Sequence, residues 1–235
     1  MNRVCARFVV GKGIVVMVSG SNSARDEVLA SIHTALGRRP GEPAPLVPPT
    51  ARVPARVPGN ADDEITLLLD EIGKLDGRTR RLEVGDLKDA LDELIQAETI
   101  RKATLWQTTE LQALGVSEIL AGLGVEIVSS QAGRDALARC DLGVTGVDMA
   151  LPETGTLVLR ASPERSRAIS LLPRVHLALV RPANLRADLV TVLQEMRTDP
   201  YFVFVTGPSR TADIELTVTI GVHGPQVLYV WVVEL

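Results

Sequence analysis

Three polar clusters in the C-terminal half of the chain carry the side chains best suited to chemistry. They are Pro152–Thr156 (Pro-Glu-Thr-Gly-Thr), Thr206–Glu215 (Thr-Gly-Pro-Ser-Arg-Thr-Ala-Asp-Ile-Glu) and Gly221–Pro225 (Gly-Val-His-Gly-Pro). Each follows or precedes an apolar run and combines glycine with hydroxyl, carboxylate, guanidinium or imidazole groups. Because α/β sheets bind ligands beyond the ends of their strands, we expect the three clusters to meet at one end of a sheet.

The second cluster suits an anionic ligand. Gly207 allows close approach of the backbone, Ser209 and Thr211 supply hydroxyls, and the planar guanidinium of Arg210 can bind a carboxylate or phosphate with two hydrogen bonds. In the alternative interpretation the hydroxyls only cap backbone groups, and Arg210 is a structural latch paired with Asp213 or Glu215. Those two carboxylates are two residues apart, so on a helix they point to different sides, which argues against an acid–base couple acting on one atom.

Glu153 and His223 are the candidates for catalysis. A carboxylate held near a sheet end can act as a base, a nucleophile or a ligand clamp, and the alternative for Glu153 is a turn-forming acid. His223 is flanked by glycines in the third cluster, and its functional and structural interpretations stay open. His33 is expected on the polar side of a helix, and His176 opens a strand as a packed core or edge residue.

The remaining candidates are expected to bind the ligand. They are Thr154, Gly155, Thr156, Gly207, Ser209, Arg210, Thr211, Asp213, Glu215 and Gly224. Arg165 and Arg167 could add positive charge to the same pocket or simply face solvent. A metal held by His223 with Asp213 or Glu215 would lack any recognised ligand spacing, so no metal site is predicted.

From residue 103 onward, strand and helix patterns alternate along the chain. Strands are predicted at 103–106, 125–128, 142–144, 156–160, 175–180, 202–205 and 227–233, with helices at 109–123, 133–139 and 185–196. Several strands, among them Phe202–Val205, are continuous apolar runs, which indicates burial on both faces. This pattern predicts an α/β fold with helices on both sides of a mostly parallel sheet. Residues 212–220 fit either a strand or a short helix.

The N-terminal part is expected to form three further pieces. Residues 1–22 are an upstream extension or an edge strand, with the natural start at Met1 or Met17, and residues 23–59 are a helix followed by an arm with seven prolines between positions 40 and 58. Residues 60–235 form the α/β domain, which begins with helices from Asp62 and from about Asp86 to Glu98. Arg78, Arg80 and Arg81 between them are expected in a solvated turn.

Composition excludes several classes of protein. A net charge of −4, with aromatic residues at 3%, argues against nucleic-acid binding. Cys5 and Cys140 form no metal or iron–sulfur motif and fit a reducing cytoplasm. The apolar stretch Phe8–Val18 is too short to span a bilayer. No phosphate-binding loop, dinucleotide fingerprint or nucleophile elbow is present.

Taken together, the clusters resemble the LUD domain of lactate-utilisation proteins, in particular that of their small C-type member. The resemblance rests on Glu153–Thr156, Ser170–Pro173 (Ser-Leu-Leu-Pro), Thr206–Glu215 and Gly221–Pro225, and it covers about residues 60–235. It implies a three-layer α/β/α fold like that of sugar-phosphate isomerases and CoA transferases. It also implies a part in oxidising L-lactate to pyruvate with partner subunits that carry the iron–sulfur clusters, while this chain binds no cofactor.

Three functions are therefore carried forward. The first is a component of lactate oxidation that binds a small anionic ligand, in a chain that could also form a homo-oligomer. The second is a stand-alone enzyme that acts on a phosphorylated sugar or a CoA thioester. The third is a scaffold whose first helix and proline-rich arm hold partner subunits.

Overall fold

The computed structural model describes residues 23–38, 56–198, 201–212, 218–221 and 223–234. The chain divides into two compact units, Met1–Val53 and Pro54–Leu235. The first unit contains helix α1 (Ser23–Ala35), whose Val28 and Ile32 side chains are exposed. No helix in the described ranges has both the length and the apolar character needed to cross a bilayer.

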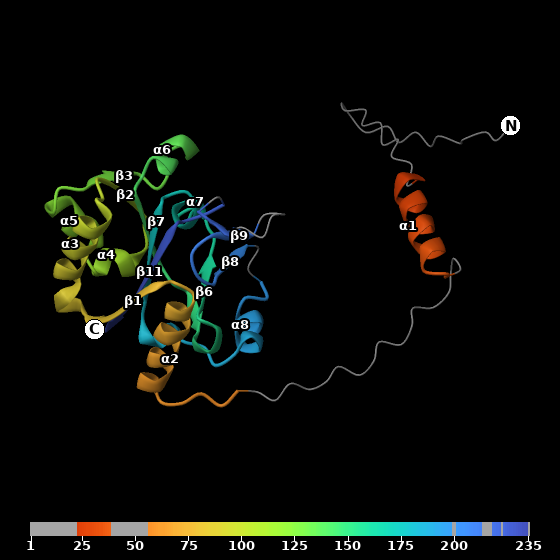
Figure 1. The fold of residues 1–235 in the computed structure, drawn as a ribbon, viewed down its shortest axis with the longest axis horizontal. Helices are drawn as coiled ribbons and strands as arrows, with labels where there is room; N and C mark the ends of the chain where they lie inside the picture. The colour runs from red at the N-terminus through yellow and green to blue at the C-terminus, as the bar shows by residue number, and fades with distance from the viewer. Residues whose placement is uncertain (1–22, 39–55, 199–200, 213–217, 222, 235) are drawn as a thin grey trace, which may run out of the picture. The chain divides into compact units, whose positions relative to one another are not determined.

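The second unit is organised around a parallel sheet with the strand order β1-β11-β7-β4-β2-β3 (Figure 1). Its strands are β1 (Arg78–Glu83), β2 (Lys102–Leu105), β3 (Glu126–Val128), β4 (Leu142–Gly146), β7 (Val175–Val180) and β11 (Val227–Glu234). Every residue of β4 and β7 is buried, as expected for strands covered on both faces. The direction of winding reverses between β2 and β4, because the chain passes from β2 outward to β3 and then returns to β4.

Helices cover both faces of this sheet, so the α/β class predicted from the sequence is confirmed (Figure 1). One face carries α3 (Leu87–Glu98), α4 (Thr109–Ala113) and α5 (Val116–Gly122). The other carries α2 (Ala61–Lys74), α6 (Arg134–Ala138) and α7 (Ala168–Leu171), whereas α8 (Leu189–Glu195) packs its Val192 with Met149, Leu151 and Val158, which lie outside this sheet. Short 3₁₀ turns η1 (Val84–Asp86), η2 (Pro152–Thr154) and η3 (Pro182–Asn184) connect these elements.

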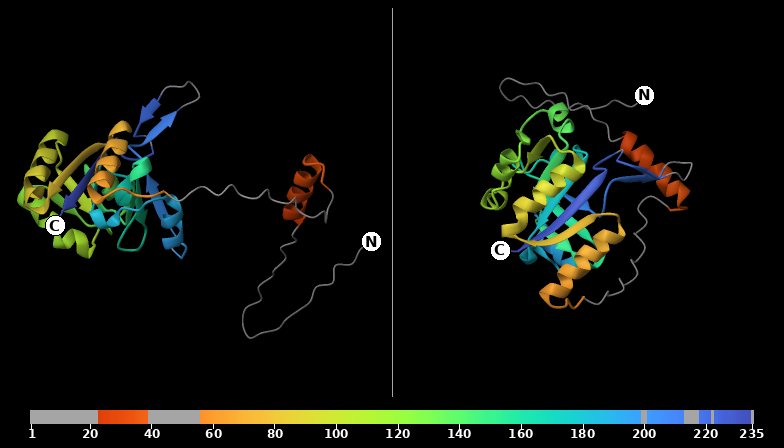
Figure 2. Two further views of the ribbon diagram at one scale, coloured as in Figure 1. Left: turned by 90° about the horizontal axis from the view of Figure 1, so that it is seen from below. Right: turned by 60° about the vertical axis from the view of Figure 1, so that its left-hand side comes forward.

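A second, antiparallel sheet lies on the α2 side and corrects one expectation. It contains β5 (Met149–Leu151), β6 (Thr156–Arg160) and β8 (Phe202–Val205). The apolar run Phe202–Val205 is therefore not a strand of the main sheet, and Phe204 is 40% exposed. Strands β9 (Arg210–Ala212) and β10 (Val218–Ile220) pair as a hairpin that projects from the body (Figure 2), so the described parts of 212–220 are extended.

Three other expectations were wrong in detail. Arg78, Arg80 and Arg81 belong to the edge strand β1, which pairs with β11, and not to a turn. The single helix predicted over 109–123 is two helices, because Gly115 adopts the left-handed conformation (φ 63°) between them. The helix predicted from residue 185 begins at Leu189, where the Asp188 carboxylate caps the N-terminus by accepting a hydrogen bond from Thr191 N at 2.8 Å.

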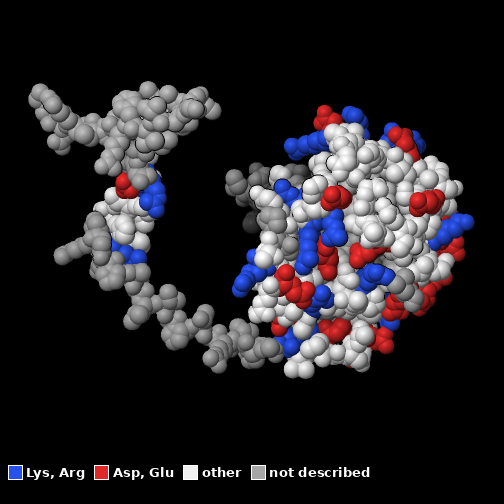
Figure 3. Space-filling view, turned by 180° about the vertical axis from the view of Figure 1, so that it is seen from behind, with Lys and Arg blue, Asp and Glu red and all other residues white. Residues whose placement is uncertain are grey.

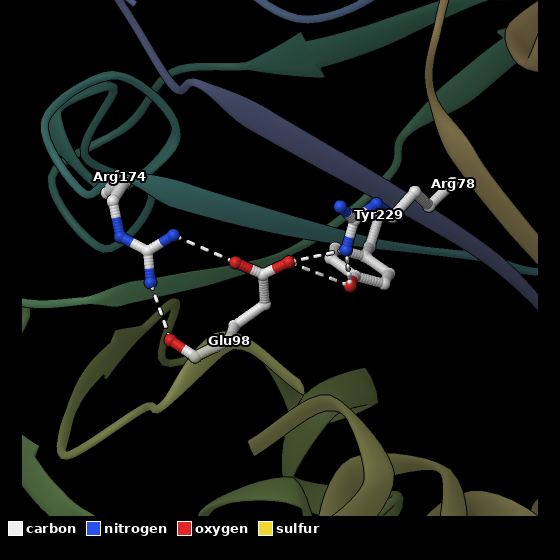
Figure 4. Close-up of polar contacts among 4 residues, drawn as sticks. All are labelled: Arg78, Glu98, Arg174 and Tyr229. Carbon is white, nitrogen blue, oxygen red and sulfur yellow. Dashed lines mark hydrogen bonds and ion pairs between the residues drawn. The ribbon is translucent and has the colours of Figure 1, made fainter. Parts of the chain in front are cut away.

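The edge strand is fastened by a polar network centred on Glu98 at the end of α3 (Figure 4). The Glu98 carboxylate accepts hydrogen bonds from Arg78, from the Tyr229 hydroxyl at 3.0 Å and from Arg174 Nη1 at 2.8 Å. Burial alone would raise the pKa of this carboxyl, but the hydrogen bonds from Arg174 and Tyr229 and the charge of Arg78 outweigh it and hold the pKa below the ordinary value. The network joins α3, β1, β11 and the segment before β7.

Charges of both signs are mixed over the face of the molecule drawn in Figure 3, where described Lys and Arg side chains alternate with Asp and Glu. One exposed ion-pair cluster is formed by Arg81, which bridges Asp62 and Glu234 at 2.6 and 2.7 Å. Solvent screens exposed pairs of this kind, and they contribute little to stability.

Candidate functional site

The first polar cluster packs directly against helix α2. Pro152–Thr154 form the turn η2, and Gly155 follows it with φ 61°. A Cβ atom on Gly155 would lie 2.8 Å from the backbone nitrogen of Ile72 and 2.9 Å from the carbonyl carbon of Glu71. Glycine is therefore required here both by conformation and by space. The contact fixes where the side chains on either side of Gly155 point.

A row of three threonine hydroxyls joins the first cluster to the second. Thr154 Oγ1 lies 2.8 Å from Thr156 Oγ1, which lies 2.9 Å from Thr206 Oγ1 at the end of β8. Strands β6 and β8 are antiparallel neighbours, so the start of one lies beside the end of the other. When each hydroxyl donates to the next, the hydroxyl at the end of the row keeps a proton that it can donate to a ligand.

Arg210 of the second cluster clamps the end of helix α2. Its Nη2 atom donates to the Leu75 carbonyl oxygen at 2.7 Å and to the Asp76 carboxylate. Gly207, at φ 94°, passes beside the same turn, since a Cβ there would lie 3.3 Å from the Leu75 carbonyl oxygen. A cation at the C-terminus of a helix satisfies a free carbonyl and opposes the helix dipole. This is a latch whose described partner is Asp76, while Asp213 and Glu215, the partners named in the alternative interpretation, lie outside the described residues.

We expect Arg210→Ala to lower the free energy of unfolding by about 1 kcal/mol, since the pair is partly exposed. Urea unfolding of the single variants Arg210→Ala and Asp76→Ala and of the double variant would measure their coupling. If the clamp is as described, removing Asp76 first makes the loss of Arg210 less costly. Strictly additive effects would contradict it.

The third cluster contacts the second through Ser209. The Ser209 nitrogen donates to the Pro225 carbonyl oxygen at 2.9 Å, and the Gly221 nitrogen donates to the Ser209 carbonyl oxygen at 2.9 Å. Gly224 packs on the same serine, because a Cβ there would lie 3.1 Å from Ser209 Cβ. His223 is exposed. The three clusters thus form one continuous chain of contacts, of which the first two clusters contact the C-terminal end of α2.

A cavity of about 310 Å³ opens at the start of this chain of contacts. Its lining combines the threonine row and one carboxylate with an apolar wall: Leu151, Glu153, Thr154, Thr156, Leu189, Phe204 and Thr206. Arg210 and His223 do not line it, so the carboxylate, guanidinium and imidazole expected around one ligand are divided between this cavity and the surface beyond it. Of the expected binding residues, Thr154 and Thr156 face the cavity together with Glu153.

Several contributors to this region lie outside the polar clusters. Arg56 holds both Glu64 oxygens, at 2.7 and 2.8 Å. The pKa of Arg56 is raised, first by this hydrogen bond and to a smaller extent by the charge of Glu153, so a cation stands near the cavity. Leu189 and Phe204 are large apolar side chains left half-exposed beside it. The sequence did not single these residues out. Apolar residues that line a cavity have no sequence pattern of their own, and Arg56 lies in the segment assigned to the proline-rich arm.

The other predicted residues are placed as follows. Thr211 lies in β9, while Asp213 and Glu215 fall outside the described residues. His176 is fully buried in β7, as expected, and Cys140 is buried, which raises the pKa of its thiol. Within the described part of the chain, no three His, Cys, Asp or Glu side chains gather closely enough to hold a metal ion.

Comparison with known proteins identifies relatives over most of the chain. The family model of the LUD domain matches residues 84–233. A protein named Lactate utilization protein C from Shouchella clausii is 27% identical over 215 residues, which is 86% of this chain and 93% of that protein. Its namesake from Bacillus subtilis is 26% identical over 89% of this chain and 95% of that protein. A DUF162 family protein from Deinococcus radiodurans, 20% identical, has a similar fold (TM-score 0.58) over 75% of this chain and all of its own.

Proposed function

The chain belongs to the LUD domain family, and on that premise we propose that it takes part in the utilisation of lactate. The observation that carries the proposal is the match to proteins named Lactate utilization protein C over nearly their whole length. These matches cover most of this chain and do not rest on one shared motif.

In this role the chain acts beside subunits that transfer electrons. Oxidation of lactate to pyruvate releases two electrons, which need an acceptor, and the two cysteines of this chain form no cluster-binding motif. Iron–sulfur partner subunits would supply that acceptor. A tagged copy of the full chain, isolated from cells grown on lactate, is expected to bring with it cysteine-rich proteins that contain iron and acid-labile sulfide.

The cavity beside α2 is the place where this chain would hold a small carboxylate. The hydroxyl row can donate a hydrogen bond to a carboxylate, and the Glu153 carboxylate can accept one from a 2-hydroxyl group. The apolar wall formed by Leu151, Leu189 and Phe204 can contact a methyl group. About 310 Å³ is at the small end of ligand cavities, which suits a ligand of this size.

Growth on lactate tests the physiological role. Deleting the gene in the organism that carries it should abolish growth on L-lactate as the only carbon source and leave growth on glucose unchanged. Reintroducing the full chain should restore growth. Normal growth of the deletion strain on lactate would overturn the proposed role.

Replacing Thr206 by valine tests the ligand separately. Valine keeps the shape of threonine but removes the hydroxyl at the end of the row, so calorimetric titration with L-lactate or pyruvate should show an affinity at least about fivefold weaker. Thr79→Val, on the exposed edge strand, is the matched control and should bind like the wild type. Equal affinities for wild type and Thr206→Val would place the ligand elsewhere and leave the physiological role standing.

A further inference from the structure

A second and larger cavity, of about 520 Å³, lies away from the three polar clusters. One side is the segment that follows β3 (Ser130, Gln131 and Ala132) with Leu137 of α6, and the other side is the loop 161–167 with Tyr201. Two cations, Arg165 and Arg167, line it. The described residues that line the cavity beside α2, in contrast, include no cation.

Arg165 contacts residues that follow two strands of the main sheet. Its Nη1 atom donates to a carboxylate oxygen of Asp148, two residues after β4, and its guanidinium lies 6.0 Å from the ring of Trp106, directly after β2. These two strands flank the point where the winding of the sheet reverses. In open α/β sheets, the crevice beyond the carboxyl ends of the strands at such a point is where ligands bind.

The loop that carries both arginines is fixed before any ligand arrives. Trp106 Nε1 donates to the Ser166 carbonyl oxygen at 3.0 Å, and Gln131 Nε2 donates to the Pro163 carbonyl oxygen at 2.8 Å. The backbone of Ser162 and that of Arg165 bond each other in both directions. A loop anchored at three points loses little conformational entropy when a ligand binds, and this favours affinity.

The guanidinium of Arg167 has a defined position but no hydrogen-bonded partner among the described residues. Its guanidinium lies over the ring of Tyr201, 5.3 Å from the centroid. In the same described ranges, no carboxylate or carbonyl oxygen accepts a hydrogen bond from this guanidinium, whereas most other arginines of the domain donate to carboxylates. Stacking on an aromatic ring leaves the five N–H donors at the edge of the guanidinium free for a ligand.

We propose that this cavity binds the anionic head group, a phosphate or carboxylate, of a small molecule with an apolar body. Arg167 supplies the free charge and Arg165 supplies the donors that Asp148 does not use. Leu137, Ala132 and the Tyr201 ring form the apolar lining for the body. Glu164, which precedes Arg165 in the same loop, accepts a hydrogen bond from the Ser162 hydroxyl at 2.9 Å.

Three ligands that share one ring test the proposal on the full chain. Phenyl phosphate and benzoate differ in their anionic head, and phenol has no charge at neutral pH. Calorimetry should show binding of one or both anions and at least about tenfold weaker binding of phenol. In a Trp231→Phe background, Trp106 is the remaining tryptophan, and its fluorescence should respond to the same titrations.

Matched arginine variants decide whether the cavity is responsible. Arg167→Ala should weaken binding of the anions by about tenfold or more, as expected for the loss of a charge-assisted hydrogen bond, and Arg167→Lys should retain part of the affinity. Arg80→Ala removes an equal charge from another arginine stacked on an aromatic ring, Trp231, and should bind like the wild type. Failure of both anions to bind more tightly than phenol, an unaffected Arg167→Ala variant, or equal loss in Arg80→Ala would each overturn the proposal.

Discussion

Replacing Gly155 by alanine is expected to lower the free energy of unfolding by about 2–5 kcal/mol, because two costs add at this position. A residue with a side chain pays about 1–2 kcal/mol to adopt the left-handed conformation that Gly155 has, with φ 61°. The new methyl group would also press on the backbone of α2 at Glu71 and Ile72, and forced overpacking costs about 1–3 kcal/mol.

The matched control is Gly115→Ala. Gly115 has nearly the same backbone angle, φ 63°, but a Cβ there would meet nothing within 4 Å. The Gly115→Ala variant therefore has only the cost of the left-handed conformation, and urea unfolding should show a free energy of unfolding lower by about 1–2 kcal/mol. Equal losses in both variants would show that the contact between the first cluster and α2 is not tight.

Gly155→Ala should also alter the candidate site, because the threonine row begins on either side of Gly155. Thr154 and Thr156 lie on either side of Gly155, and the Thr156 hydroxyl meets that of Thr206 at 2.9 Å. Pushing η2 away from α2 moves both hydroxyls. Helix α2 is thus the common support of the first two clusters, and residues that contact no ligand decide the shape of the cavity. This explains why glycines alternate with hydroxyl residues in these clusters.

The main sheet could be predicted from the sequence because its buried strands are continuous apolar runs. β7 is apolar along its length except for His176, and this kind of run occurs where helices cover both faces. Phe202–Val205 has the same pattern but lies in the antiparallel sheet with Phe204 exposed. The Phe204 side chain faces a cavity and not a covering helix, and periodicity cannot distinguish the two.

The edge strand β1 was missed for the opposite reason. Three of its six residues are arginines, which suggest a solvated turn. Arg78 stacks on Tyr229 and Arg80 on Trp231, and both have carboxylate partners on α3, so the long side chains cover the sheet edge while their charges stay in water. The partners are distant in sequence, and only the fold brings them together.

The candidate site was partly predictable. The glycine and hydroxyl residues next to the strands indicated which loops contact one another. In the structure the first cluster contacts the second at Thr156–Thr206, and the second contacts the third at Ser209. Which side chains turn into a cavity depends on α2, whose relation to the clusters has no local signal. Arg165 and Arg167 illustrate the same limit, since Asp148 and Trp106 determine where Arg165 lies.

Stability is expected to fall as the pH drops from about 6.5 towards 4, because His176 resists protonation in the folded chain. The imidazole is fully buried in β7, with Nε2 2.9 Å from the Thr145 hydroxyl and with no partner for Nδ1 among the described residues. Burial lowers the pKa of His176 from 6.5 to about 4. As the pH falls, the unfolded chain takes up a proton on His176 before the folded chain does. The contribution of the neutral, buried imidazole to the free energy of unfolding is therefore fully present above pH 6.5 and is lost as the pH falls through the pKa of His176 in the folded chain.

The size of the effect follows from the two pKa values. At about pH 5 the difference amounts to about 2 kcal/mol of unfolding free energy, and near pH 4 to about 3 kcal/mol. Urea unfolding of wild type and His176→Leu between about pH 4 and 8 measures it. Leucine leaves the Thr145 hydroxyl without its partner, so the variant should be less stable at about pH 7, but its stability should change less between about pH 6.5 and 5. His223→Gln, at an exposed imidazole, is the control and should keep the slope of the wild type. An unchanged slope in His176→Leu would mean that protonation of the buried ring is not what limits stability in acid.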